Sequence, residues 1–507
     1  MRLNILIGGK AGQGINKVSG IIAETLVKNG YYIFNYRDYP SIIRGGNNFN
    51  IVSISDRPIA SHESAIDVVI ALDEDTIKIH KSSLKKDGLI LAYKDFSGLG
   101  LNTNVALAGS LIKVLGFDNK VLASVVKAKI KNKLSVDALT EGYNKQTSKF
   151  NLKVLNNQIS ILSGSSAIAK GAINSKIDMY FAYPMTPATG VSEMLAKDQL
   201  KNNCLVFQPE GEISAINMAL GASFSGARTM VGTSGGGYDL MSEGLSLQGM
   251  SQIPLVVYLA SRPGPATGLP TYSMQGDLEI ALRSGHGEFP RIVVAPGDPD
   301  EAMEKVNEAF YLSEKFGALS ILLSDKHLAE SEFSLFSKNK KTLPVVVKRL
   351  IPGQGVVKVS GYESDADGLA TEDPKIAIKN ADNRLKKYQA IKKECQKLEM
   401  IKIYGKADSK NLVIGWGSTK GAIVDAIDGE DFKFLQVLYM MPMSNQIKSE
   451  ILAAKNVILV ETNLTGQLGR LIREKTGLKI EKRILKYDGR PFKSDELKQE
   501  LLNKLKS

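Results

Sequence analysis

The sequence predicts an α/β protein built from three domains. At 507 residues the chain is long enough for about three domains of ordinary size. Short apolar runs alternate with segments whose apolar residues recur at helical spacing, and glycine- or proline-rich turns follow several of the runs. This alternation is typical of parallel sheets with helices between the strands. We place the domains at residues 1–150, 160–335 and 340–507.

The composition is that of a soluble globular protein, with 43% hydrophobic and 23% charged residues. No apolar run reaches the roughly 18 residues that a membrane span needs, and the N-terminal residues lack a signal-peptide cleavage pattern. We therefore expect a cytoplasmic protein that does not enter a membrane.

Only two cysteines occur, Cys204 and Cys395. Two cysteines cannot form a disulfide framework or supply a four-cysteine site for zinc or an iron–sulfur cluster. We expect no metal site on this chain, so any redox metal must be carried by another polypeptide.

Basic residues outnumber acidic ones by 65 to 53, which gives a net charge of +12. The excess is partly concentrated in residues 120–153 and 384–406. Scattered lysines usually form a solvated face, and the alternative is contact with an acidic partner or a phosphate-bearing ligand. Because these runs contain few aromatic residues and no known binding module, nucleic acid is not an expected partner.

In the first domain, a strand at residues 3–7 leads through a glycine-rich turn into a helix that extends to Val27. Gly12 and Gly14 lie in this turn, where glycine lets a phosphate group approach backbone N–H groups. A second glycine corner contains Arg44. Both corners are candidate ligand loops, but the first matches neither the dinucleotide fingerprint nor a P-loop, and a tight structural turn explains it equally well.

Further strands of the first domain are predicted at residues 49–54 and 68–72, which gives βα units around a mixed sheet. From Lys133 to Gln158 the sequence is polar and poor in helix signals. We expect the linker to the second domain there.

The second domain places polar side chains after three predicted strands. Thr186 follows the first strand and lies between two prolines, which hold the backbone extended. Glu212 follows a strand at residues 204–207, which we expect to be buried, and Arg262 follows a strand at residues 255–260. Because ligands of open α/β sheets bind at the carboxyl ends of the strands, we expect these side chains to border one site.

Glu210 and Glu212 lie in the turn before a helix whose apolar face is predicted at Ile213, 216, 219 and 220. No charged residue occurs between Ile213 and Ala227. One interpretation is that both carboxylates only favour the positive end of the helix dipole. The other is that one of them serves chemistry beside an uncharged helix.

The third domain begins with extended, loop-rich segments and a lysine-rich helix at residues 382–401. Strands are predicted at residues 411–417 and 457–461. The polar residues at the end of the last strand, namely Glu461, Asn463 and Gln467, indicate a hydrogen-bond network, with contact to a ligand as the alternative.

Taken together, several ordered motifs resemble the α chain of the 2-oxoacid:ferredoxin oxidoreductases, a family that depends on thiamine diphosphate. The glycine corners of residues 8–46 are similar to the γ subunit of the same family, fused here ahead of the α part. The α-type motifs are Tyr-Pro-Met-Thr-Pro at 183–187, the acidic turn with Glu212, Thr-Ser-Gly-Gly-Gly at 233–237, Gly-Pro-Ala-Thr-Gly-Leu-Pro-Thr at 264–271 and Gly-His-Gly-Glu at 285–288.

The resemblance implies a γ-type βα domain, a doubly wound thiamine-diphosphate-binding domain of the pyrimidine type and a transketolase C-terminal-like domain. In this family the cofactor is held between two chains, and a glutamate of the α chain meets its pyrimidine ring. Counting nine residues back from Gly221, as in thiamine enzymes, selects Glu212 over Glu210. A carboxyl group at the ring nitrogen promotes the tautomer that activates the cofactor.

The matching positions also give the remaining candidate site residues. Those expected at the cofactor are Tyr183, Pro184, Ser234 and Gly235, and those expected at the substrate or coenzyme A are Thr186, Arg262 and Thr271. Two departures bear on substrate selection: Gly236 stands where the family commonly has proline, and Tyr-Ser-Met follows Thr271 where a basic residue and Thr-Glu are frequent.

The chain has no Gly-Asp-Gly motif with a downstream asparagine to hold Mg²⁺ and the diphosphate. The resemblance therefore implies a separate β subunit that carries this site and a [4Fe-4S] cluster, in an αβ or (αβ)₂ complex. The expected reaction is oxidative decarboxylation of a 2-oxoacid to acyl-CoA and CO₂, with ferredoxin as electron acceptor. The fused γ–α arrangement favours 2-oxoglutarate.

Three alternatives remain open. The complex could use pyruvate or a broad range of 2-oxoacids, or the chain could be a non-catalytic assembly subunit whose acidic turn only caps a helix. A nicotinamide dehydrogenase built on the N-terminal glycine turn is disfavoured, because the fingerprint and its acidic ribose partner are missing.

Overall fold

The computed structural model describes residues 1–41, 45–130, 132, 134–335, 342–355, 357 and 360–506. The chain divides into two compact units. One contains Met1–Leu162, strand β13 and the segment Lys493–Lys498, and the other contains Ser163–Glu330 and most of the remaining chain. Each unit is described by itself.

The first unit is built on a seven-stranded mixed sheet with the order β5-β4-β1-β3-β2-β13-β6. Strand β1 runs parallel to β4 and antiparallel to β3, which confirms the predicted mixed sheet. The strands are β1 (Arg2–Gly9), β2 (Tyr32–Asp38), β3 (Asn48–Ser55), β4 (Ile66–Ala71), β5 (Leu84–Ala92), β6 (Ser160–Ser163) and β13 (Glu332–Leu335).

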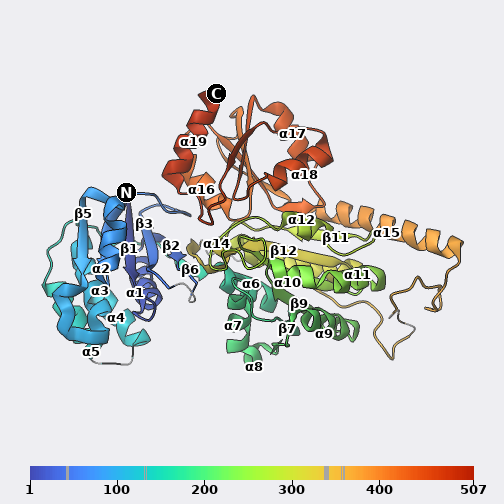
Figure 1. Cartoon of the computed structure of the whole chain (residues 1–507), viewed down its shortest axis with the longest axis horizontal. Helices are drawn as coiled ribbons and strands as arrows, with labels where there is room; N and C mark the ends of the chain where they lie inside the picture. Colours follow the sequence, from blue (N-terminus) through green and yellow to red (C-terminus); the bar gives the residue numbers. More distant parts are fainter. Residues whose placement is uncertain are drawn as a thin grey trace. The chain divides into compact units, whose positions relative to one another are not determined.

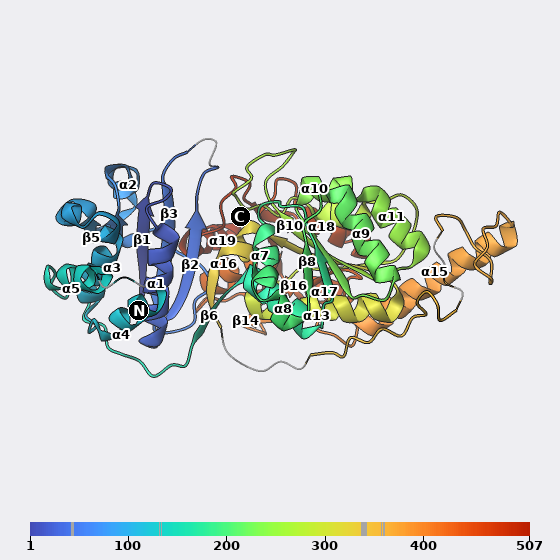
Figure 2. The same ribbon diagram turned by 90° about the horizontal axis from the view of Figure 1, so that it is seen from below.

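Helix α1 packs across β2 and β3, and α3 packs on α5 (Figure 2). The polar segment after Lys133 is not helix-poor as we expected, because Leu134–Asn144 forms α5 and buries Ala138 and Leu139 in the core. One helical stretch, Tyr93–Leu115, is long and apolar enough to cross a membrane by length and composition alone, and 56% of it is buried inside the fold. The helices are α1 (Ile15–Lys28), α2 (Glu74–His80), α3 (Thr103–Leu115), α4 (Lys120–Lys129) and α5 (Leu134–Asn144).

The second unit contains two sheets (Figure 1). The larger has the order β17-β11-β12-β10-β9-β7-β8 and is parallel except for β17. The strands are β7 (Met179–Phe181), β8 (Leu205–Phe207), β9 (Thr229–Thr233), β10 (Leu255–Ser261), β11 (Arg291–Val294), β12 (Leu319–Asp325) and β17 (Tyr439–Met441).

Strand β8 is the edge of this sheet, so the expectation that it is buried was wrong. Leu205 and Phe207 are 49% and 43% exposed, because β7 covers only one side of the strand. The prediction for the following helix was also partly wrong, since Ile216, Ala219 and Leu220 are buried but Ile213 faces outward.

Helices flank this sheet. They are α6 (Gly164–Asn174), α7 (Thr189–Lys197), α8 (Gln199–Asn202), α9 (Glu212–Phe224), α10 (Gly235–Leu240), α11 (Ser242–Ser251), α12 (Leu278–Arg283), α13 (Pro299–Phe316) and α14 (Lys326–Glu330). Helix α9 packs on β7 and β9, and α11 packs on α9.

The smaller sheet of this unit has the order β14-β16-β15-β18-β19, with β14 antiparallel to its neighbour. Its core is continuous with that of the larger sheet. The elements are α15 (Pro374–Cys395), β14 (Ile401–Gly405), β15 (Asn411–Trp416), α16 (Thr419–Ala426), β16 (Lys433–Val437), α17 (Gln446–Ala453), β18 (Asn456–Glu461), α18 (Gln467–Thr476), β19 (Lys482–Leu485) and α19 (Ser494–Lys506). The lysine-rich helix α15 begins earlier than predicted and projects from the body of its unit (Figure 1).

Candidate functional site

The acidic turn separates its two carboxyl groups into different environments. Glu212 is the first residue of α9 and is only 6% exposed, whereas Glu210 is exposed and accepts a hydrogen bond from the Ser214 hydroxyl. This hydrogen bond lowers the pKa of Glu210. Glu210 therefore acts locally at the helix start, while Glu212 points into the protein.

The Glu212 carboxyl group lies against the glycine-rich loop after β9. A Cβ atom added at Gly237 would lie 2.7 Å from Glu212 Oε1, a clash that only glycine avoids. Within the described part of the chain, the hydrogen bonds include none to the Glu212 side chain. The result is a sheltered carboxyl group with free acceptor capacity, which suits the ring nitrogen of a bound aromatic cofactor.

Arg262 and Thr186 meet although they follow different strands. The Arg262 guanidinium donates from Nη1 to the Thr186 carbonyl oxygen at 2.9 Å. Burial lowers the pKa of the guanidinium, and the negative charge of Asp277 opposes that shift. The guanidinium is thus half-buried at the carboxyl edge of the sheet, with most of its donors available.

Thr271 lies in the loop that follows Arg262. It is buried, and its hydroxyl oxygen has no hydrogen-bond partner in the described structure. The backbone further along this loop is held by the neighbouring loop at Gly489, which accepts from the Ser273 N–H at 2.9 Å. The Thr271 hydroxyl is therefore held inside the loop with unused hydrogen-bonding capacity.

The other predicted cofactor residues fall into two groups. Tyr183 and Pro184 are exposed after β7. Ser234 is fully buried at the start of α10, and its hydroxyl group has no hydrogen-bond partner among the described residues. Gly235 follows it, and a Cβ atom there would lie 2.7 Å from Asp277 Oδ2.

Asp277 was not among the residues predicted from the sequence, although its carboxyl group lies against Gly235 of the glycine-rich loop. The only signal was an acidic residue directly before a helix, because Asp277 precedes α12 without capping it. Its closeness to Gly235 depends on the tertiary fold.

The predicted network at the end of β18 is present. The buried Glu461 carboxylate accepts from Trp416 Nε1 at 3.0 Å and from Asn463 Nδ2 at 2.7 Å. Asn463 Nδ2 also donates to the Gln275 carbonyl oxygen at 3.2 Å, and Gln467 contacts the next residues of the same segment. The smaller sheet thus holds the loop that carries Thr271 and Asp277.

In the first unit, Gly12 and Gly14 line a cavity of about 1160 Å³ together with Lys10, Lys17 and Lys78. Arg44 lies outside the described residues. Acidic side chains, namely Asp38, Asp73 and Asp75, line the cavity as well, so its lining carries both signs of charge.

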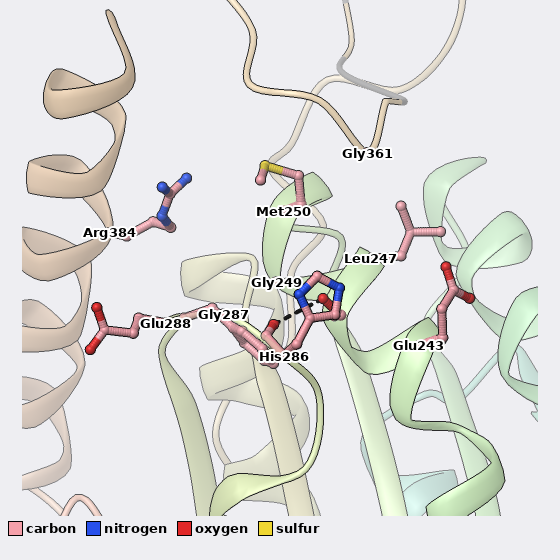
Figure 3. Close-up of a pocket in the computed structure, with 11 residues that line it drawn as sticks. Glu243, Leu247, Gly249, Met250, His286, Gly287, Glu288, Gly361 and Arg384 are labelled. Atoms are coloured by element: carbon pink, nitrogen blue, oxygen red, sulfur yellow. Dashed lines mark hydrogen bonds between the residues drawn. The ribbon is translucent and has the colours of Figure 1, made fainter. Parts of the chain in front are cut away.

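The Gly-His-Gly-Glu motif borders a separate hollow of about 260 Å³ (Figure 3). Arg384 of α15 and Glu288 lie on one side of it, and Glu243 lies on the other. The Ser246 hydroxyl donates to the His286 carbonyl oxygen at 2.9 Å. None of the residues that line this hollow is a candidate site residue. In the described parts of the chain, no group of three or more His, Cys, Asp or Glu side chains is placed to hold a metal ion.

Two family models match the chain. Residues 170–399 match the thiamine-diphosphate-binding part of pyruvate flavodoxin/ferredoxin oxidoreductase. Residues 4–102 match the pyruvate ferredoxin/flavodoxin oxidoreductase model.

Full-length relatives are similar over the whole chain. The α subunit of a 2-oxoacid:ferredoxin oxidoreductase from Saccharolobus solfataricus is 30% identical, covering 98% of this chain and 97% of its own length. The corresponding subunit from Sulfolobus sp. is 29% identical, covering 100% and 97%. The solved 2-oxoglutarate:ferredoxin oxidoreductase from Magnetococcus marinus, with 2-oxoglutarate, coenzyme A and succinyl-CoA bound, is similar with a TM-score of 0.88 and 25% identity over 99% of each chain.

Proposed function

The chain belongs to the α subunits of the 2-oxoacid:ferredoxin oxidoreductases, and from this we propose that it converts 2-oxoglutarate and coenzyme A to succinyl-CoA and CO₂ together with a separate β subunit. Ferredoxin accepts the two electrons. The enzyme class follows from the family, and the substrate and the residue roles are the proposal.

The proposal rests on the environment of the Glu212 carboxyl group. Its carboxyl group is buried against Gly237 and has no protein partner in the described structure, so it can hold a proton at the pyrimidine nitrogen of thiamine diphosphate. The bound cofactor supplies the electron sink that decarboxylation of a 2-oxoacid requires. Tyr183, Pro184, Ser234 and Gly235 would border the same cofactor.

Arg262 is the proposed carboxylate ligand. Its planar guanidinium can hold a carboxylate through two parallel hydrogen bonds, and Nη1 is already fixed by the Thr186 carbonyl oxygen. Two threonines would complete the contacts to the 2-oxoacid or coenzyme A. They are Thr186 and Thr271, and the Thr271 hydroxyl is buried without a hydrogen-bond partner in the described structure.

A β subunit is needed because this chain provides only part of an active site. Helix α9 has no charged residue after Glu212, yet Ile213 is 59% exposed and Met218 39% exposed. We take this exposed apolar surface as the contact for the β subunit. We place the diphosphate site, Mg²⁺ and the [4Fe-4S] cluster on that subunit, in a cytoplasmic αβ or (αβ)₂ complex.

The test is turnover by the complex that copurifies with this chain. A panel of 2-oxoglutarate, pyruvate and branched 2-oxoacids is assayed with coenzyme A and ferredoxin. The proposal predicts the highest kcat/KM for 2-oxoglutarate. Equal rates with the other acids would favour broad specificity, and no turnover with any 2-oxoacid would favour the assembly role.

A further inference from the structure

Asp277 is a partly buried acid whose charge interacts with Arg262, the proposed carboxylate-binding residue. Its Oδ2 atom is buried and has no hydrogen-bond partner among the described residues. The carboxyl group lies close enough to Gly235 to exclude any side chain there. An acceptor in this state is costly unless it gains a donor or a proton.

The backbone on both sides of Asp277 is fixed by one side chain. Gln467 Nε2 donates to the Gly276 carbonyl oxygen at 2.7 Å, and Gln467 Oε1 accepts from the Leu278 N–H at 3.0 Å. The backbone at Asp277 therefore cannot shift without breaking these hydrogen bonds.

Charged groups from three elements surround this carboxyl group. Arg262 faces it from the loop after β10, Asp239 from α10, and Glu279 follows on its own helix, paired with Arg283 at 3.0 Å. Burial raises the pKa of Asp277 to about 6; the nearby Ser261 hydroxyl lowers it, Asp239 adds to the increase and Arg262 opposes it. Adding one charge close to the Asp277 carboxyl group is therefore enough to change the protonation of that group near neutral pH.

We propose that the Asp277 carboxyl group takes up a proton when the carboxylate of a 2-oxoacid binds at Arg262. This rests on the proposed function, in which Arg262 holds that carboxylate. The ligand brings a second negative charge next to Asp277, and like charges in a poorly solvated site favour the neutral acid. The proton comes from the solvent.

The direction of the pH dependence follows from linkage. Below the pKa of the free protein Asp277 is already neutral, and binding is tightest. As pH rises through that value, binding must supply a proton, so the dissociation constant increases until pH passes the higher pKa of the complex. If that shift is one to two pH units, the dissociation constant increases about tenfold between pH 5.5 and 7.5.

The test is calorimetric titration of the complex with 2-oxoglutarate and with pyruvate, in two buffers that differ in ionisation enthalpy. With the same shift of one to two pH units, the expected result is an uptake of about 0.4 to 0.8 proton per site near pH 7, and weaker binding as pH rises. Binding without proton uptake, or with no dependence on pH, overturns the inference.

Three variants test which residue takes up the proton when the ligand binds. Asp277→Asn is isosteric and breaks no cap, so it should fold, lose the proton uptake and bind at pH 7.5 at least as tightly as the parent. Asp239→Asn should keep the uptake but move its midpoint to lower pH, because one repelling charge is gone. Glu279→Gln, at a partly exposed acid paired with Arg283, is the control that should change neither the proton uptake nor its midpoint. Uptake that persists in Asp277→Asn would rule out Asp277.

Binding is measured separately from turnover, so the two proposals can fail separately. Proton-linked binding without turnover would refute the proposed reaction and leave Asp277 supported. Turnover with proton-independent binding, or no binding at all, would refute the role of Asp277.

Discussion

At the scale of single residues, the acidic turn shows how two carboxyl groups two positions apart acquire different tasks. Glu210 is exposed and bonded to Ser214, which explains its lowered pKa and its place at the helix start. Glu212 is buried against a glycine, and its side chain makes no hydrogen bond to the described residues. A substitution at each position therefore separates chemistry from helix stability.

Replacing Glu212 by Gln in the assembled complex should lower kcat by about 10² to 10⁴, because the amide keeps the size but cannot share an acidic proton. Assembly and iron content should not change. The direct measurement is exchange of the thiazolium C2 proton with deuterium, by quench and NMR. Glu210→Gln is the control and should exchange as fast as the parent; slow exchange there, or fast exchange in Glu212→Gln, would show the assignment to be wrong.

Replacing Arg262 by Lys keeps the positive charge but loses the planar pair of donors. The hydrogen bond to the Thr186 carbonyl oxygen would also be weakened. We expect KM for the 2-oxoacid or coenzyme A to increase at least tenfold, which corresponds to the loss of about one charge-assisted hydrogen bond. Steady-state kinetics measure the two KM values. If KM is unchanged for both the 2-oxoacid and coenzyme A, Arg262 does not belong to the site.

At the scale of elements, the sequence predicted the strands and turns that carry the site, because alternating apolar runs and glycine or proline turns are local signals. It did not predict the exposed edge strand β8, since an apolar run does not reveal whether a neighbouring strand covers it. The outward position of Ile213 was missed for the same reason: its cover belongs to another chain in our proposal. Asp277 was missed because its contact with Gly235 joins distant parts of the sequence.

The exposed face of α9 gives a prediction about assembly. Ile213→Asp should prevent copurification of the β subunit, because it places a charge in the proposed apolar interface. Since the position is exposed, the free energy of unfolding of the isolated chain should change by no more than about 0.5 kcal/mol. Leu452→Asp, on an exposed site of α17, is the matched control and should assemble normally. Pull-down and thermal unfolding measure the two effects.

The clamp formed by Gln467 gives a prediction about stability. Gln467→Ala removes both hydrogen bonds to the segment around Asp277 and leaves a backbone N–H and a carbonyl group without partners. We expect a loss of roughly 1 to 3 kcal/mol in unfolding free energy, together with a higher KM because Thr271 and Asp277 lie on that segment. Arg470 lies on α18 like Gln467, and Arg470→Ala removes only a partly exposed ion pair to Glu279 of α12, so it should cost less than about 1 kcal/mol. Chemical denaturation compares the two variants.

At the scale of the whole molecule, the two sheets of the second unit are joined by buried charges as well as by a common core. Glu301 of α13 is almost completely buried and bonds to Lys402 of β14 at 3.2 Å and to Gln436 of β16 at 2.7 Å. Burial alone would raise the pKa of Glu301, but the positive charges of Lys420 and Lys402 lower it. The smaller sheet is therefore part of the framework of the site.

The division of labour between subunits gives the last prediction. The chain has two cysteines, both free and buried, and no diphosphate motif. The purified chain alone should be colourless, contain no stoichiometric iron, bind thiamine diphosphate weakly and reduce no dye with any 2-oxoacid. The same assays after coexpression with the β subunit provide the positive control. Iron in the isolated chain, or turnover without a second polypeptide, would mean that the active site is not shared and that the apolar face of α9 has another partner.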